Sequence, residues 1–169
     1  MTININPKWQ LNEPADVRLD ANGKFPLLHG LNPMCLPEDY LAFMSKSEGA
    51  ALKDRDGYFL AHFKDRIDIL EIEWLGDLTN LEIGTSNYLL DNRKDRLVPE
   101  GFAKIGFAEP GPYDIVMNVR EGDADYGQIY VWLQAFDPWM SGDNTLGFGW
   151  VADNFTAFMN GLTARENLR

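Results

Sequence analysis

Cysteine and histidine are scarce in this chain, and their scarcity restricts the chemistry that it can carry out. The 169 residues include one cysteine, Cys35, and two histidines, His29 and His62. A single cysteine excludes an intramolecular disulfide and a zinc site built mainly of thiolates. Cys35 could pair with either histidine as a nucleophile, but a cysteine just before an apolar helix start is more often a buried structural thiol. We therefore predict no metal and no cofactor.

Basic residues are also few. Lysine and arginine number 15 against 26 aspartates and glutamates, which gives a formal net charge of −11. Nucleic-acid binding needs clustered cations, so we predict no direct contact with nucleic acid and none with anionic membranes. Long apolar runs are missing too, because no window reaches the roughly 18 apolar residues of a membrane-spanning helix. The first residues lack a basic stretch followed by an apolar one, and we expect a cytoplasmic protein.

Known catalytic motifs are missing as well. The sequence has no Walker loop, no nucleophile elbow and no His-Glu-x-x-His pair. Gly147-Phe148-Gly149 lacks the other residues of a phosphate-binding loop, and its glycines predict a strand that approaches another backbone closely. The stretch Glu121-Gly122-Asp123-Ala124-Asp125 departs from the ligand order of a calcium-binding hand, so we interpret it as a solvated hairpin turn. The motifs therefore provide no positive case for an enzyme.

The apolar content is sufficient for one folded domain. Apolar residues make up 45% of the sequence, and a chain of about 150 residues can bury roughly 68–70% of its unfolded surface without disulfides. Residues 1–35 hold four prolines and few periodic runs, which predicts an irregular N-terminal arm with one short element around residues 17–19. Residues 36–169 are predicted to form a single domain.

Helical patterns begin and end this predicted domain, and strand patterns fill its middle. Pro37 and the two carboxylates after it favour a helix start, Tyr40, Phe43 and Met44 share one face, and Gly49 is placed to end the helix. Strands are predicted at residues 57–63, 67–69, 71–74, 101–107, 114–119, 128–133 and 146–151, a short helix at 86–90, and a last helix from residue 152 or 153. This order predicts an α+β fold with a mostly antiparallel sheet flanked by helices, arranged as a meander covered on one face.

The negative charge is concentrated in the strand-rich half. Residues 97–164 hold nine acids against Lys104 and Arg120, a net charge of −7, and the predicted loops there also carry aromatic residues, Tyr113 among them. Aromatic side chains rimmed by carboxylates are typical of a surface for a basic protein partner, although the same aromatics could cap the core while the acids are merely solvated. The candidate partner-binding residues are Glu121, Asp123, Asp125, Tyr126, Asp137, Trp139 and Asp143.

Four segments in order resemble the SUKH superfamily of bacterial immunity proteins and fungal cell-wall-synthesis regulators. They are a leucine-proline helix start, a proline-led strand that ends in glycine, a glycine, tyrosine and tryptophan strand, and a closing helix. The segments lie at residues 36–49, 97–106, 127–132 and 151–162. The resemblance implies an α+β, non-enzymatic domain whose shared residues are mostly structural. Tyr130, Trp132, Phe155 and Phe158 match its motifs and are interpreted as core.

The resemblance further implies that the protein works by binding another protein. The first hypothesis is an immunity protein that neutralises a basic toxin domain, possibly a nuclease, by stoichiometric binding. A regulatory or scaffold interaction module is the alternative. A small-molecule-binding domain or enzyme that uses Asp114, Tyr130 or His62 as polar groups is a third, less favoured one.

Overall fold

The computed structural model describes residues 3, 9–11, 13–14, 16–47, 50–52, 56–76, 78–90, 101–133 and 146–168. In this part of the chain the backbone forms eight strands, three α-helices and two short 3₁₀ helices. The strands are β1 (Trp9–Leu11), β2 (Ala50–Leu52), β3 (Tyr58–His62), β4 (Ile67–Leu75), β5 (Phe102–Glu109), β6 (Tyr113–Asn118), β7 (Ile129–Leu133) and β8 (Phe148–Ala152). The helices are η1 (Leu28–Gly30), α1 (Glu38–Met44), α2 (Leu78–Leu90), α3 (Phe155–Gly161) and η2 (Arg165–Asn167).

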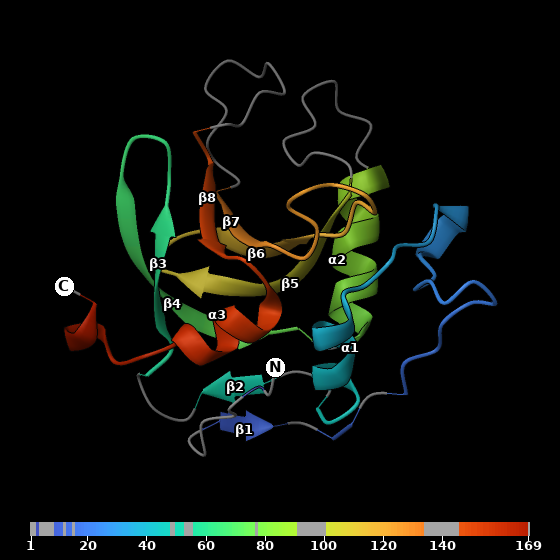
Figure 1. Ribbon diagram of the computed structural model, residues 1–169, viewed down its shortest axis with the longest axis horizontal. Helices are drawn as coiled ribbons and strands as arrows, with labels where there is room; N and C mark the ends of the chain where they lie inside the picture. Colours follow the sequence, from blue (N-terminus) through green and yellow to red (C-terminus); the bar gives the residue numbers. More distant parts are fainter. Residues whose placement is uncertain are drawn as a thin grey trace.

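The sheet closes on itself. Strands β5, β6, β7 and β8 are neighbours in sequence order, as a meander requires, and β8 continues to β3 and then β4. Because β4 also pairs with β5, these six strands form a closed antiparallel barrel, and β2 and β1 extend from β4 (Figure 1). The prediction of a mixed, mostly antiparallel fold is confirmed. The predicted open meander with helices on one face needs correction, because the sheet is a closed barrel, and all three α-helices contribute side chains to its main core.

Strand β4 is long enough to close the barrel. Its first part pairs with β3 from Ile67 to Glu71, and its second part pairs with β5 from Glu71 to Leu75. The pairing register shifts in β4 between Ile72 and Trp74 and in β5 between Lys104 and Gly106. Such irregularities increase the local bend and twist of a strand. A Cβ atom on Gly106 would lie 2.7 Å from the carbonyl oxygen of Trp74. The backbones therefore meet closely at Gly106, and only glycine leaves room for this contact.

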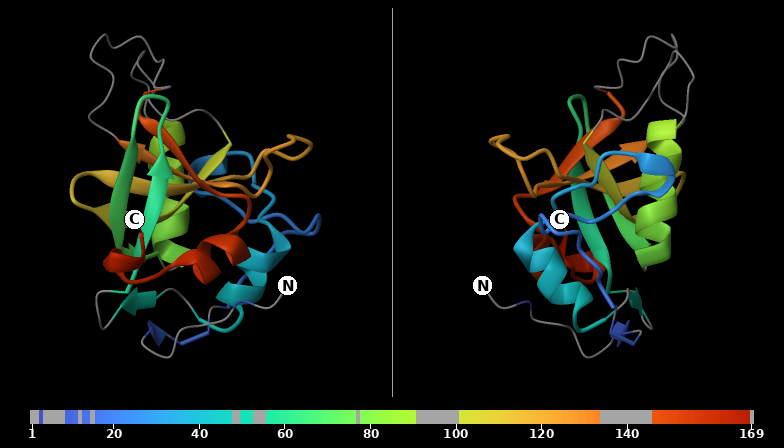
Figure 2. Two further views of the ribbon diagram at one scale, coloured as in Figure 1. Left: turned by 60° about the vertical axis from the view of Figure 1, so that its left-hand side comes forward. Right: turned by 90° about the vertical axis from the view of Figure 1, so that its right-hand side faces the viewer.

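Two short helices pack together at one end of the barrel, and the longest lies along its side (Figures 1 and 2). Helix α1 begins after Pro37, as predicted, and α3 begins after Asn154, whose side chain accepts a hydrogen bond from the Ala157 amide. The Phe155 ring lies 4.9 Å from that of Tyr40, edge-on, and 5.1 Å from that of Phe43. Helix α2 packs against β5 and η1.

The two faces of the sheet carry separate apolar clusters. Inward residues such as Ile115 and Val131 are fully buried in the main core, together with Phe155 and Phe158 of α3. Trp132 pairs directly with Asp114, and Tyr130 with Val116, so these side chains share the opposite, outer face. There Trp132, Val116 and Phe102 form a second cluster, with Tyr130 and Phe148 packed against it. The prediction of core positions holds for the two α3 residues and for Trp132, which is buried in the second cluster, whereas Tyr130 is only partly buried against that cluster.

Several local predictions need correction. Residues 16–20 form neither helix nor strand. Helix α1 ends at Met44, well before Gly49, which lies outside the described residues. The predicted short helix at 86–90 is the last part of α2, which begins at Leu78 and buries its Leu81 side chain in the main core. Gly149 allows a close approach of the Phe63 ring, to which a Cβ would come within 2.9 Å, and not of another backbone.

Candidate protein-binding surface

The hairpin turn between β6 and β7 carries three of the predicted partner-binding carboxylates. Backbone hydrogen bonds shape it: the Tyr126 amide donates to the Asp123 carbonyl and the Gln128 amide to the Asp125 carbonyl. Gly122 and Gly127 have positive φ values of 88° and 85°, which side chains rarely adopt. The interpretation of Glu121–Asp125 as a hairpin turn is therefore confirmed.

The turn gathers acids from three parts of the chain at one end of the barrel. A Cβ on Gly127 would lie 3.5 Å from Pro37 at the start of α1, so the turn packs beside that helix. Asp153 follows β8 and contributes negative potential at Tyr130. Asp39 of α1 likewise contributes negative potential at Tyr126 of the turn. The term acidic end refers below to five carboxylates of this region, each at least partly exposed: Asp39, Glu121, Asp123, Asp125 and Asp153.

Two cations are built into the acidic end. The Arg120 guanidinium lies 2.8 Å from an Asp123 oxygen and 3.9 Å from an Asp125 oxygen. The Lys24 ammonium lies 2.5 Å from Glu121. Five carboxylates against two cations leave a net charge of −3. Because Arg120 forms ion pairs with two of the turn's carboxylates, the positions of these carboxylates are partly fixed.

Hydrogen bonds and charge shift the pKa values of groups around the turn. Burial acts to raise the pKa of Asp125, but the nearby Asn118 amide, the hydrogen bond from Tyr130 and the charge of Arg120 outweigh it, so the pKa is lowered. Burial, followed by the hydrogen bond and charge of Asp125, raises the pKa of Tyr130 to about 12. The Tyr130 hydroxyl lies 3.1 Å from an Asp125 oxygen. Asp125 is therefore ionised, and Tyr130 a neutral donor, throughout the physiological range.

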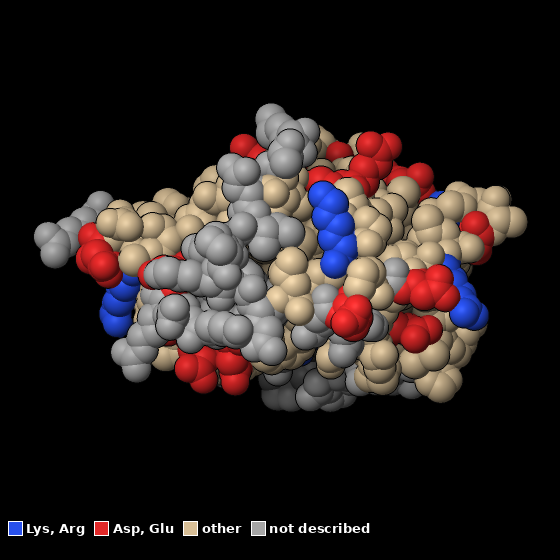
Figure 3. All heavy atoms as spheres, turned by 90° about the horizontal axis from the view of Figure 1, so that it is seen from below, with Lys and Arg blue, Asp and Glu red and all other residues tan. Residues whose placement is uncertain are grey.

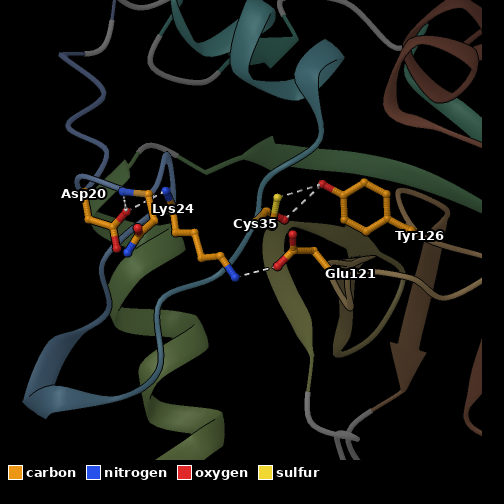
Figure 4. A network of polar contacts seen from close by, with 6 residues as sticks. Asp20, Lys24, Cys35, Glu121 and Tyr126 are labelled. Carbon is orange, nitrogen blue, oxygen red and sulfur yellow. Dashed lines mark hydrogen bonds and ion pairs between the residues drawn. The ribbon is translucent and has the colours of Figure 1, made fainter.

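The N-terminal arm is tied to this turn by contacts between residues far apart in sequence (Figure 4). Lys24 reaches Glu121 across 97 positions. The Tyr126 hydroxyl donates to the Cys35 carbonyl at 3.2 Å and lies 3.5 Å from its sulfur. Burial and the hydrogen bond with the Cys35 side chain raise the pKa of Tyr126. Half-buried Tyr126 therefore holds the arm. Neither contact could be predicted from the sequence, whereas Arg120 and Asp123 are only three positions apart.

The remaining sequence-predicted residues are distributed as follows. Asp137, Trp139 and Asp143 lie outside the described residues. Tyr113 is a buried member of β6 and not a loop residue, and its hydroxyl donates to Asp68 at 3.1 Å. His62 is exposed on β3, with its ring 5.6 Å from that of Trp150. Among the described residues no three acids, cysteines or histidines are grouped to hold a metal.

A pocket of about 440 Å³ opens beside the turn. Residues of the arm form one wall and the ends of β5 and β6 another, with Thr85 of α2 between them. Its described lining includes none of Asp114, Tyr130 and His62, the polar groups suggested for a small-molecule site. Asp114 is instead fully buried on the outer face, 2.6 Å from the Lys104 ammonium.

A closed antiparallel barrel with helices packed on it, and an acidic hairpin at one end, defines a mixed α/β domain. The model of the SMI1/KNR4 family (SUKH-1) matches residues 33–161, and the chain belongs to this family. Its members are generally non-enzymatic immunity or regulatory proteins that act through protein contacts. No curated protein and no solved structure matches the chain. None of the described helices is long and apolar enough to cross a membrane.

Proposed function

We propose that this protein is an immunity protein that binds a basic toxin domain and blocks it by occupying its cationic surface. The observation that carries the proposal is the acidic end, where carboxylates from α1, the β6–β7 turn and the β8–α3 connection come together. By sequence, Asp137, Trp139 and Asp143 belong to the same proposed surface. The cytoplasm is its proposed location.

Acidic side chains are spread over the described surface, so a cationic partner is attracted from several directions. In the face seen in Figure 3, acidic side chains are spread over several regions with few basic ones between them. Buried Asp114 is compensated by Lys104, so this pair adds little to the outside field. Fields of this kind raise association rates by about 10- to 1,000-fold, and salt weakens them.

The immunity function is tested by growth rescue. The chain is co-expressed in bacteria with toxin domains encoded beside its own gene. Stoichiometric neutralisation predicts that growth recovers with a cognate toxin and that toxin and chain co-elute as a complex of fixed composition. If no neighbouring toxin is neutralised, the immunity proposal is wrong, and a regulatory interaction module becomes the better description.

The electrostatic mechanism is tested on the same complex with two charge-matched variants. Asp123→Lys plus Asp125→Lys should lower the association rate about tenfold or more at low salt. Glu73→Lys plus Glu109→Lys makes the same change of charge on exposed residues near the other end of β6, roughly 17 Å away at about 3.4 Å per residue. Equal effects of both variants, or a rate that does not change with ionic strength, would rule out binding by the acidic end.

A further inference from the structure

The pocket beside the β6–β7 turn has the size of a ligand site. Its volume of about 440 Å³ falls in the range of roughly 300–1,000 Å³ that binding pockets occupy. The lining is mixed, with apolar side chains on most sides and charged or polar groups at a few places. The apolar members are Leu27, Leu31, Pro33, Met34, Phe102 and Val119.

The pocket is held open by fixed contacts on each side. The Leu28 amide lies 3.3 Å from the Ser86 hydroxyl of α2, and the bond from Tyr126 to the Cys35 carbonyl fixes the other end of the arm. Gly101 has a φ of 88°, and a Cβ there would lie 2.0 Å from Cγ of Arg120. This glycine leaves room for the Arg120 side chain to pass the pocket wall and reach its carboxylates.

The charges at the pocket favour a cation. Arg120 is already compensated, since its guanidinium lies 2.8 Å from Asp123 and 5.2 Å from the Phe102 ring. Glu121 lines the pocket with a side chain that is 57% exposed. One of its oxygens receives the Lys24 ammonium, and the other points toward Cys35 (Figure 4). The protein's own Lys24 therefore already forms an ion pair with Glu121, the carboxylate that lines the pocket.

We propose that this pocket receives an arginine side chain of the protein partner. The methylene groups of the arginine lie against Leu27 and Leu31, and its guanidinium bonds Glu121 in place of Lys24. A planar guanidinium matches both oxygens of a carboxylate, which the single ammonium of lysine does not. The proposal rests on the proposed function, because it identifies the part of a basic partner that anchors on the acidic end.

The test uses small probes and the intact chain, so it needs no partner. N-acetyl-arginine amide and its neutral isostere N-acetyl-citrulline amide are titrated separately while backbone amide resonances are recorded by NMR. The arginine probe should give saturable shifts at Leu31, Asn32, Met34 and Glu121. Citrulline should bind about three- to fivefold more weakly, because a partly exposed ion pair contributes little more than that.

Two substitutions separate the pocket from general charge. Asn32→Trp places a large side chain on an exposed lining residue without changing charge, and should abolish the shifts. Asn22→Trp, an exposed residue of the same arm outside the lining, is its matched control and should leave them unchanged. Lys24→Met removes the internal competitor and should tighten arginine binding about two- to fivefold.

The results distinguish a failure of the arginine pocket from a failure of the proposed immunity function. No saturable shift at the pocket, equal binding of citrulline and arginine, or equal effects of the two tryptophan variants would overturn the arginine pocket. If the charge reversal at Asp123 and Asp125 still slows partner association, the proposed function stands without it. If the arginine probe binds and Asn32→Trp blocks it while no toxin is neutralised, the pocket stands and the immunity function fails.

Discussion

The buried ion pair between Lys104 and Asp114 gives the sharpest test of how this barrel is stabilised. Asp114 is fully buried on the outer face of β6, and the Lys104 ammonium lies 2.6 Å from its carboxylate with a side chain that is 19% exposed. The ammonium also lies 5.9 Å from the Trp74 ring and 6.0 Å from the Phe107 ring. Lys104→Met keeps the apolar stem but leaves the Asp114 charge in this aromatic setting without its cation.

The expected loss follows from the cost of an uncompensated buried charge. Removing one partner of a buried pair costs about 3–5 kcal/mol, and the partial exposure of Lys104 places the loss near the lower value, about 3 kcal/mol. For a domain of this size, each kcal/mol shifts the melting temperature by about 2–4 °C. Urea unfolding should show the loss of free energy, and calorimetry a melting temperature about 6–12 °C lower.

Two further variants make this reasoning refutable. Lys104→Met combined with Asp114→Val replaces the pair by apolar groups that suit a strand, and should lie within about 1 kcal/mol of the native protein. Lys64→Met, an exposed lysine in the β3–β4 hairpin, should cost less than about 0.5 kcal/mol. A loss below about 1 kcal/mol for Lys104→Met alone, or additive losses in the double variant, would show that the pair does not control the stability of this face.

Three other predictions concern a helix cap, the barrel closure and an ionisation. Asn154→Ala removes the acceptor of the Ala157 amide and should cost about 1 kcal/mol in urea unfolding. Gly106→Ala drives a Cβ against the Trp74 carbonyl and should cost about 1–3 kcal/mol, and an unchanged stability would mean that the strands separate freely there. Tyr130 should ionise near pH 12, seen by ultraviolet absorbance and lost in Tyr130→Phe. Since folding raises this pKa, its stabilisation is complete below about pH 10 and disappears as the pH rises through about 12.

The local elements were predictable where short-range patterns decide them. Pro37 followed by two carboxylates marks the start of α1, and the dense β-branched and aromatic stretch 129–133 is strand β7. Of helix α2, only the last part, residues 86–90, was predicted from the sequence. Gly84 lowers its helix propensity by about 1 kcal/mol, and a Cβ there would come within 3.0 Å of Lys104 on β5. Close packing on β5 therefore accommodates a residue that disfavours a helix in isolation.

The candidate surface was predictable in its charge but not in its construction. The acids of the β6–β7 turn are visible as a cluster in the sequence. Of their two cations, Arg120 is adjacent to the turn in sequence, whereas Lys24 lies 97 positions from Glu121. A similar long-range contact joins the two short helices: Asp39 accepts hydrogen bonds from the amide and hydroxyl of Thr156, 117 positions away. Pairing over such distances depends on the folded chain.

The sequence by itself determined the sign of the charge, the scarcity of thiol and imidazole groups, and most strands and helix starts, because each follows from composition or from residues within a few positions of one another. The tertiary structure decided that the sheet closes, that Trp132 and Tyr130 face outward, and that a pocket forms between the arm and the turn. These features depend on the meeting of distant strands and on which face of a strand is enclosed. A shift of one residue in register would reverse those faces without changing the local pattern.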